Sequence, residues 1–169
     1  KSNAFQSPKC HYCDAPETFT HLLTCSNEIS TTFREKLLES VRQYMLNRDV
    51  PDAFISSFSL CIQRAVSSTP PPEFHARSCP ATDCSNLQAN LGNFSILRGF
   101  LTYQWRRLYE SSHSMYCYEV EANSIDVISG LIQIIWSKQL QYWENHMTNV
   151  HKYTPSPASK TNDKLLQYR

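Results

Sequence analysis

Four residues near the start of the chain have the types and the spacing of metal ligands. Two residues separate Cys10 from Cys13, and three separate His21 from Cys25. Three thiolates and one imidazole satisfy the tetrahedral coordination of structural Zn²⁺ and leave no position open for chemistry. We expect the cysteine pair to converge in a turn, with His21 and Cys25 one helical turn apart on the same face. The alternative is a set of unrelated thiols and a surface histidine.

The elements around these ligands must hold them, because the ligand segment is too poor in apolar residues to bury a core. Pro16 and Thr18 are suitable residues to start a short helix before His21. Leu22 and Leu23 would then pack this segment against the helices that follow. Zinc binding contributes on the order of 10 kcal/mol or more in small finger peptides, which is enough to fix such a segment.

Hydrophobic periodicity predicts a mainly α protein. Ser30 or Thr31 is expected to cap the first long helix, and Pro51 suits the first turn of the second. Later apolar patterns predict one helix over 91–108 and another from Ser124 to 150. The expected organisation is a zinc knuckle (1–29), a helical pair (30–66), a Pro/Ser-rich linker (67–86), a helical segment (87–152) and a disordered tail (153–169).

Composition limits the class of protein further. Sixteen Lys and Arg balance fifteen Asp and Glu, so nucleic-acid binding would have to come from a local patch. Three glycines argue against a many-stranded β fold and exclude a glycine-rich phosphate loop. No apolar run approaches the roughly 20 residues of a membrane span. Seven cysteines, an odd number, favour metal ligation in an intracellular, reducing compartment.

The segment CHYCDAPETFTHLLTC resembles the zinc-binding segment that follows the polymerase region in reverse transcriptases of non-LTR retroelements. The family pattern is a Cys-x2-Cys, a Glu-Thr pair, His-Leu-Leu and a final Cys. Beyond the zinc ligands, the matching residues are Glu17, Thr18, Leu22 and Leu23. The resemblance covers about sixteen residues and implies a bound structural zinc ion.

A second likeness lies in LGNFSILRGFLTYQW, which is similar to the helical region after this finger in some retroelement-derived reading frames. The residues that carry it are Leu91, Gly92, Leu97, Arg98, Gly99 and Trp105. The family's later helix carries a Trp, then Arg-Asn, then His-Gly. Here Trp143 and His151 keep the spacing, but His146, Met147 and Lys152 replace the other residues, which indicates divergence.

By resemblance, the chain would help a reverse transcriptase to hold template RNA or target DNA. A first residue of Lys rather than Met suggests a fragment, so the polymerase would lie upstream of Lys1. Two alternatives remain open. The chain is a helical protein-interaction module with a purely structural zinc, or it is a retroelement remnant without retained activity.

Two groups of residues are candidates for contact with nucleic acid, because cations bind phosphates and aromatic rings stack on bases. The first is Lys9, His11 and Tyr12, beside the cysteine turn. The second is Arg98, Arg106 and Arg107 with Tyr103 and Trp105. Helical spacing also places Trp105 on the apolar stripe, so the competing interpretation is a core tryptophan beside solvated arginines.

A second metal site would need residues from a looser pattern. Cys79-x4-Cys84, with His75 and Asp83, could be completed by Cys61 or by His113 and Cys117. No second tight cysteine pair is present, so free thiols are the default interpretation. We find no paired carboxylates, activated nucleophile or open metal position, and we expect neither enzymatic activity nor a small-molecule substrate.

Overall fold

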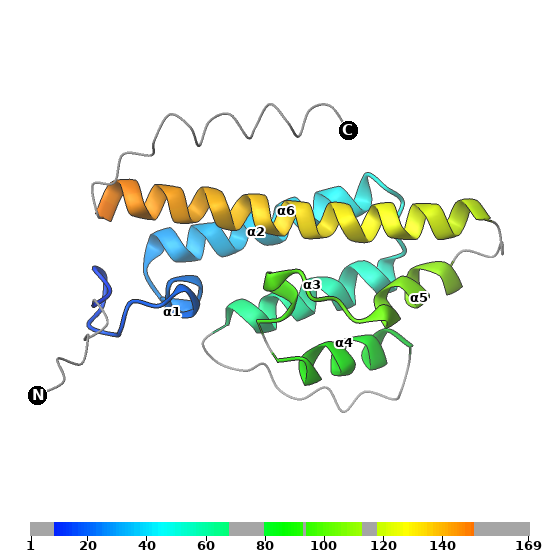
Figure 1. Cartoon of the computed structure of the whole chain (residues 1–169), viewed down its shortest axis with the longest axis horizontal. Coiled ribbons are helices and arrows are strands. Elements are labelled where there is room, and N and C mark those ends of the chain that lie inside the picture. The colour runs from blue at the N-terminus through cyan, green and yellow to red at the C-terminus, as the bar shows by residue number, and fades with distance from the viewer. Residues whose placement is uncertain (1–8, 68–79, 93, 113–117, 151–169) are drawn as a thin grey trace, which may run out of the picture.

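Two long antiparallel helices, α2 (Glu28–Leu46) and α6 (Tyr118–Val150), form the main axis of the protein (Figure 1). This computed structural model describes residues 9–67, 80–92, 94–112 and 118–150. At one end of the pair the Tyr44 hydroxyl donates to the Asp126 carbonyl oxygen (3.3 Å). At the other end the Ser30 hydroxyl lies 2.7 Å from that of Tyr142. The expected mainly helical fold is confirmed, and the described residues contain no strand.

The apolar stripe predicted for α2 is confirmed, but the helix begins earlier than expected. Phe33, Leu37, Val41 and Met45 recur every fourth residue and are buried. Asn27, rather than Ser30 or Thr31, caps the helix, since its side-chain oxygen accepts from the Ser30 N–H (2.9 Å).

Helix α3 (Asp52–Val66) packs beneath α2 and starts directly after Pro51, as expected. Its Phe54 and Phe58 rings lie edge-on to Trp105, with ring centroids 5.2 and 5.0 Å from the indole. Trp105 is completely buried, so the core interpretation of this residue is confirmed.

Helix α4 (Pro80–Asn90) begins inside the segment expected to be a linker. Proline is well tolerated in the first turn of a helix, where its missing N–H would have no partner. Ala81, Cys84 and Gln88 then recur at helical spacing and are buried. The linker prediction is therefore wrong for residues 80–86, while residues 68–79 lie outside the described part of the chain.

The single helix predicted over 91–108 is also wrong. The chain forms a short 3-10 turn, η1 (Ile96–Arg98), followed by helix α5 (Tyr103–Ser111). Gly92 (φ 98°) and Gly99 (φ 80°) adopt left-handed backbone conformations that interrupt the helix.

Gln88 holds this interrupted segment through four hydrogen bonds. Its amide nitrogen donates to the Ser95 hydroxyl (2.7 Å) and to the Phe100 carbonyl (2.8 Å). Its amide oxygen accepts from the Thr102 N–H (3.1 Å) and from the Trp105 indole (3.0 Å). A fully satisfied buried amide fixes a unique geometry, so Gln88 joins α4, η1 and α5 into one unit.

Helix α6 starts at Tyr118, earlier than the expected Ser124. Ser124 is buried within the helix, and its hydroxyl donates to the Glu110 carboxylate on α5 (2.9 Å). Within the described ranges, no helix combines the length and the apolar character that crossing a bilayer requires. The predicted disordered tail, residues 153–169, lies outside the described residues.

The hydrogen bonds of Gln88 generate a stability prediction. We expect Gln88→Leu to lower the free energy of unfolding by about 2–4 kcal/mol, because it leaves buried donors from Thr102 and Trp105 without an acceptor. Chemical denaturation followed by circular dichroism measures this. Gln63→Leu on the exposed side of α3 is the matched control and should change stability by about 0.5 kcal/mol or less. Equal effects of the two substitutions would contradict the role of Gln88.

Candidate metal centre

A tight turn brings the first cysteine pair together. The Cys10 N–H donates to the Ala15 carbonyl oxygen (2.8 Å), and an isolated antiparallel bridge joins Lys9 to Pro16. This closure folds the chain back on itself around Cys13. Cys10 is buried and Cys13 is half-buried, so both sulfurs lie on the inner side of the knuckle.

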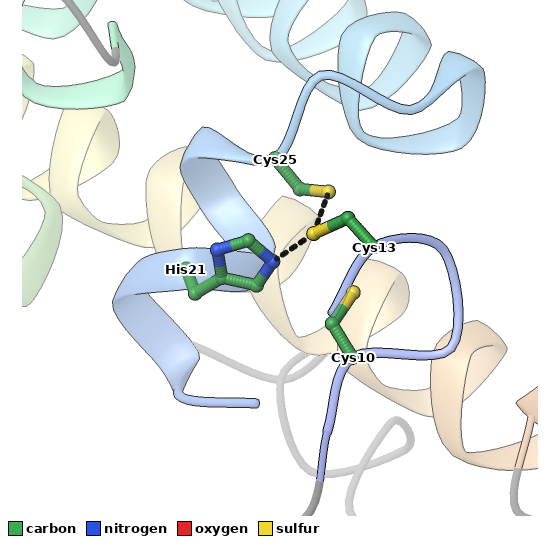
Figure 2. Close-up of side chains that lie close together, drawn as sticks. All are labelled: Cys10, Cys13, His21 and Cys25. Atoms are coloured by element: carbon green, nitrogen blue, oxygen red, sulfur yellow. Dashed lines mark hydrogen bonds between the residues drawn. The ribbon is translucent and has the colours of Figure 1, made fainter. Parts of the chain in front are cut away.

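The second ligand pair is carried by the short helix α1 (Phe19–Thr24). The Thr18 hydroxyl accepts from the His21 N–H (3.0 Å), which confirms the predicted start of this helix. His21 projects from α1, and Cys25 follows the last helical residue in a non-helical conformation. The pair therefore lies one turn apart, facing the cysteine turn (Figure 2).

The four side chains converge on one point (Figure 2). The Cys13 sulfur lies 3.1 Å from Nε2 of His21 and 3.8 Å from the Cys25 sulfur. All four donor atoms lie within 4.8 Å of one another. A tetrahedral ion with metal–sulfur bonds of about 2.3 Å places its sulfurs about 3.8 Å apart. A disulfide needs about 2.0 Å, so the geometry is that of a metal site with separate thiols.

The thiols of this cluster differ in how readily they ionise. Burial opposes ionisation of Cys25, but hydrogen bonds from Asn27 and from the neighbouring cysteines outweigh it and lower its pKa. At Cys13 a backbone hydrogen bond from Ala15 favours the thiolate, whereas desolvation and the two other thiols prevail and raise its pKa. The thiolate is the form of cysteine that binds metal.

Arg34 of α2 holds the ligand-bearing end of α1. Its guanidinium donates to the carbonyl oxygens of Leu23 (3.0 Å) and Cys25 (2.8 Å), and also to the Thr31 hydroxyl (2.8 Å). A cation at the C-terminus of a helix satisfies carbonyl groups that have no partner within the helix. Arg34 therefore fixes the backbone that presents Cys25.

The knuckle is attached to the helical body by apolar packing and by polar contacts with α6. Leu22 and Leu23 are completely buried, which confirms their predicted role. The Tyr142 hydroxyl donates to the Leu22 carbonyl oxygen (3.0 Å). Nε2 of His146 lies 3.4 Å from a carboxylate oxygen of Glu17, and both side chains are almost completely buried. This contact joins the knuckle to α6.

The predicted nucleic-acid residues of the knuckle lie on its surface. Lys9 and His11 are exposed, and Tyr12 is partly exposed. The rings of His11 and Tyr12 meet edge to face with centroids 5.2 Å apart. Asp14 lies 4.0 Å from the Lys9 ammonium, but both side chains are so solvated that this ion pair is weak.

The three arginines of the second patch have different surroundings. Arg98 and Arg107 are exposed, whereas Arg106 is half-buried and pairs with Glu110 at 2.6 Å. The Arg107 guanidinium lies 5.3 Å from the centroid of the exposed Tyr103 ring. Arg98, Arg107 and Tyr103 are therefore the accessible part of this patch.

The second metal-site candidate is only partly within the described residues, which exclude Cys79, His75, His113 and Cys117. Of the others, Cys61 and Cys84 are buried. The Cys84 thiol donates to the Gln104 carbonyl oxygen (3.2 Å). Among the described residues, the His, Cys, Asp and Glu side chains that lie close enough together to hold a metal ion are Cys10, Cys13, His21 and Cys25 of the knuckle.

Several residues that support the site were not identified from the sequence. The capping role of Asn27 could be predicted from the sequence, because an asparagine followed by Glu28 in the first turn is typical of a helix start. Arg34 and Tyr142 carry no comparable signal. Their roles depend on contacts between α1, α2 and α6 that local spacing does not encode.

The fold and the site define a mainly helical protein with a Cys₃His cluster packed at one end. Comparisons with family models, with curated proteins and with solved structures found no match. The functional argument therefore rests on the residues of the chain itself.

Arg34 provides a test of the surroundings of the site. We expect Arg34→Met to weaken metal affinity about 10- to 100-fold, because hydrogen bonds around a site orient its ligands. Titration with Co²⁺, a coloured probe of tetrahedral thiolate sites, against a competing chelator measures this change. Arg42→Met, on the exposed face of the same helix, is the matched control and should leave the affinity unchanged. Equal affinities of the two variants would refute the role of Arg34.

Proposed function

We propose that Cys10, Cys13, His21 and Cys25 bind one structural Zn²⁺. The support is the convergence of three sulfurs and one imidazole nitrogen within 4.8 Å, since this soft donor set suits zinc rather than magnesium or calcium. Four protein ligands complete the coordination and leave no place for substrate or water. The ion would stabilise the fold of the knuckle without taking part in catalysis.

Metal analysis tests this proposal directly. Inductively coupled plasma mass spectrometry of the purified chain should give about one zinc per molecule after exhaustive dialysis. Cys10→Ser and Cys25→Ser should each lose zinc, because three remaining ligands no longer enclose the ion. Cys61→Ala removes a buried thiol outside the cluster and should retain zinc. Equal zinc in the wild type and in both serine variants would overturn the assignment.

We further propose that the knuckle binds single-stranded nucleic acid, RNA or DNA, without catalytic activity of its own. The observation that carries this proposal is the exposure of Lys9, His11 and Tyr12 at the cysteine turn. The ammonium group suits a phosphate, and the two rings offer faces for bases. A rigid metal-bound turn would hold the backbone of these groups in place and so lower the entropic cost of binding.

The arginine patch and the family resemblance support the same function. Tyr103 and Arg107 expose a second aromatic and cationic pair on α5. The likeness of residues 10–25 to the segment after the polymerase in retroelement reverse transcriptases suggests that the chain assists such an enzyme. Because the chain is almost neutral and offers few cations, binding should be weak, and its affinity should fall as salt rises in proportion to the few phosphates contacted.

A filter-binding titration with a single-stranded RNA of about 20 nucleotides at low salt tests the proposal. We expect micromolar affinity that falls as salt rises, and about tenfold weaker binding by Tyr12→Ala, because a stacked base contributes about 1–3 kcal/mol. A single-stranded DNA of the same sequence shows whether the sugar is recognised.

Lys36→Ala is the control for this titration. Lys36 lies exposed on α2, so its loss removes the same charge that Lys9→Ala removes, but away from the cysteine turn. Lys9→Ala should reduce both the affinity and the salt dependence, whereas Lys36→Ala should leave them unchanged. No binding by the zinc-loaded protein in the micromolar range would refute the nucleic-acid function.

The competing function is that of a protein-interaction module in which zinc only secures the knuckle. It predicts an exposed apolar surface, and α6 provides one with Trp136, Leu140 and Trp143. This function predicts no salt-dependent affinity for RNA. A retroelement remnant without activity would show neither nucleic-acid binding nor association with protein.

A further inference from the structure

The solvent-facing side of α6 carries large apolar side chains. Trp136, Leu140 and Trp143 are spaced by four and three residues, so they lie next to one another on the helix. The Phe19 ring of the knuckle reaches this surface, with its centroid 6.4 Å from that of Trp143. On the other side, Gly99 packs closely against Trp136, and the exposed Phe100 follows it. We term the α6 apolar face the set of Trp136, Leu140, Trp143 and Phe19, together with the exposed Phe100, which is next to Gly99 in the chain.

The exposed area of this face is large for a small protein. Each of the five side chains is between 36% and 64% exposed. Since a large aromatic side chain has about 150–250 Å² to bury, the face leaves on the order of 500 Å² of apolar surface in water. That value is near the upper end of the range for monomeric proteins, about 300–600 Å².

Few charges interrupt this surface. Between Ser124 and Asn149 the acidic and basic side chains are Asp126, Lys138, Glu144 and the buried His146. The centres of protein interfaces are depleted of charge and enriched in tryptophan, tyrosine and phenylalanine. A nucleic-acid surface needs cations, and the five residues of the face include none. The chemistry of the face therefore fits a protein partner.

We infer that the α6 apolar face is the contact surface between two copies of this chain. A standard interface buries about 800 Å² on each partner, of which somewhat more than half is apolar. The roughly 500 Å² of the α6 apolar face is close to the apolar area that one partner buries in such an interface. The polar groups around the face would form the rim of the interface. A helix face can also pair with itself across a twofold axis, which is the commonest symmetry of protein dimers.

Antiparallel pairing of the two α6 helices provides a geometry for this contact. Trp136 lies four residues before Leu140 and Trp143 lies three residues after it. A twofold axis near Leu140 therefore places Trp136 of each copy close to Trp143 of the other. Offset or edge-to-face indole pairs would then bury both rings. This dimer depends on neither the zinc nor the nucleic-acid proposal.

Sedimentation velocity between about 1 and 300 µM, a range that brackets a weak to moderate dimer, tests the inference. We expect the mass to double with concentration, and quenching of tryptophan fluorescence by acrylamide to fall over the same range. Leu140→Glu should weaken the dimer at least tenfold, because it buries a carboxylate without a partner. Gln141→Glu is the matched control, since it adds the same charge to the next, exposed position of the helix.

Three results would overturn the inference. The first is a monomer at every concentration. The second is a dimer that Leu140→Glu and Gln141→Glu affect equally, because another surface would then mediate it. The third is a dimer that forms only after deletion of residues 153–169, because the chain's own C-terminal segment would then cover the face. Circular dichroism and the thermal unfolding midpoint, unchanged in both variants, verify that each protein is folded.

Discussion

The position of the metal cluster depends on one buried junction, where Tyr142 of α6 meets α1 and α2. The Tyr142 ring stacks on Phe33 with centroids 4.4 Å apart, and its hydroxyl bonds to Leu22 and Ser30. The Leu22 carbonyl belongs to the helix that presents His21. A buried hydroxyl with two partners tolerates little displacement, because either lost bond would leave a polar group without compensation in the core. The junction therefore aligns the knuckle with the helical body.

The four Cys and His side chains and the residues around them stabilise the knuckle in different ways. The donor set can enclose an ion, but it cannot decide how the knuckle lies against the rest of the protein. Leu22, Leu23 and the contact between Glu17 and His146 decide this, with Arg34 completing the last turn of α1. Because two long helices support it, the site resembles a structural metal site with fixed ligands more than a site that exchanges its metal.

Local chemistry made the cluster of three cysteines and one histidine and most helices predictable from the sequence. The ligand spacing, the Thr18 cap and the stripes of α2 and α3 are short-range patterns, and the structure agrees with them. The segment after α3 was not predictable in this way. Its periodic apolar residues suggest one helix, but the fold is set by Gln88, which bonds to residues 7–17 positions further along the chain.

Long-range contacts also explain why the surroundings of the site were missed. Tyr142 and Leu22 are 120 residues apart in sequence, and no spacing rule connects them. The wrong start predicted for α6, at Ser124, also results from a contact between distant residues. A serine before an apolar run is a common helix start, yet here it is a buried residue that bonds across to Glu110 of α5.

The order of the chain has a consequence for biosynthesis. The four side chains of the Cys/His cluster lie within residues 10–25, so all of them are available soon after this segment leaves the ribosome. Helix α2, against which α1 packs, follows directly, but the α6 residues that contact the knuckle, Tyr142 and His146, are made more than a hundred residues later. Until then α1 packs against α2 without its contacts to α6, and the protection of the knuckle from premature association depends on the rate of translation.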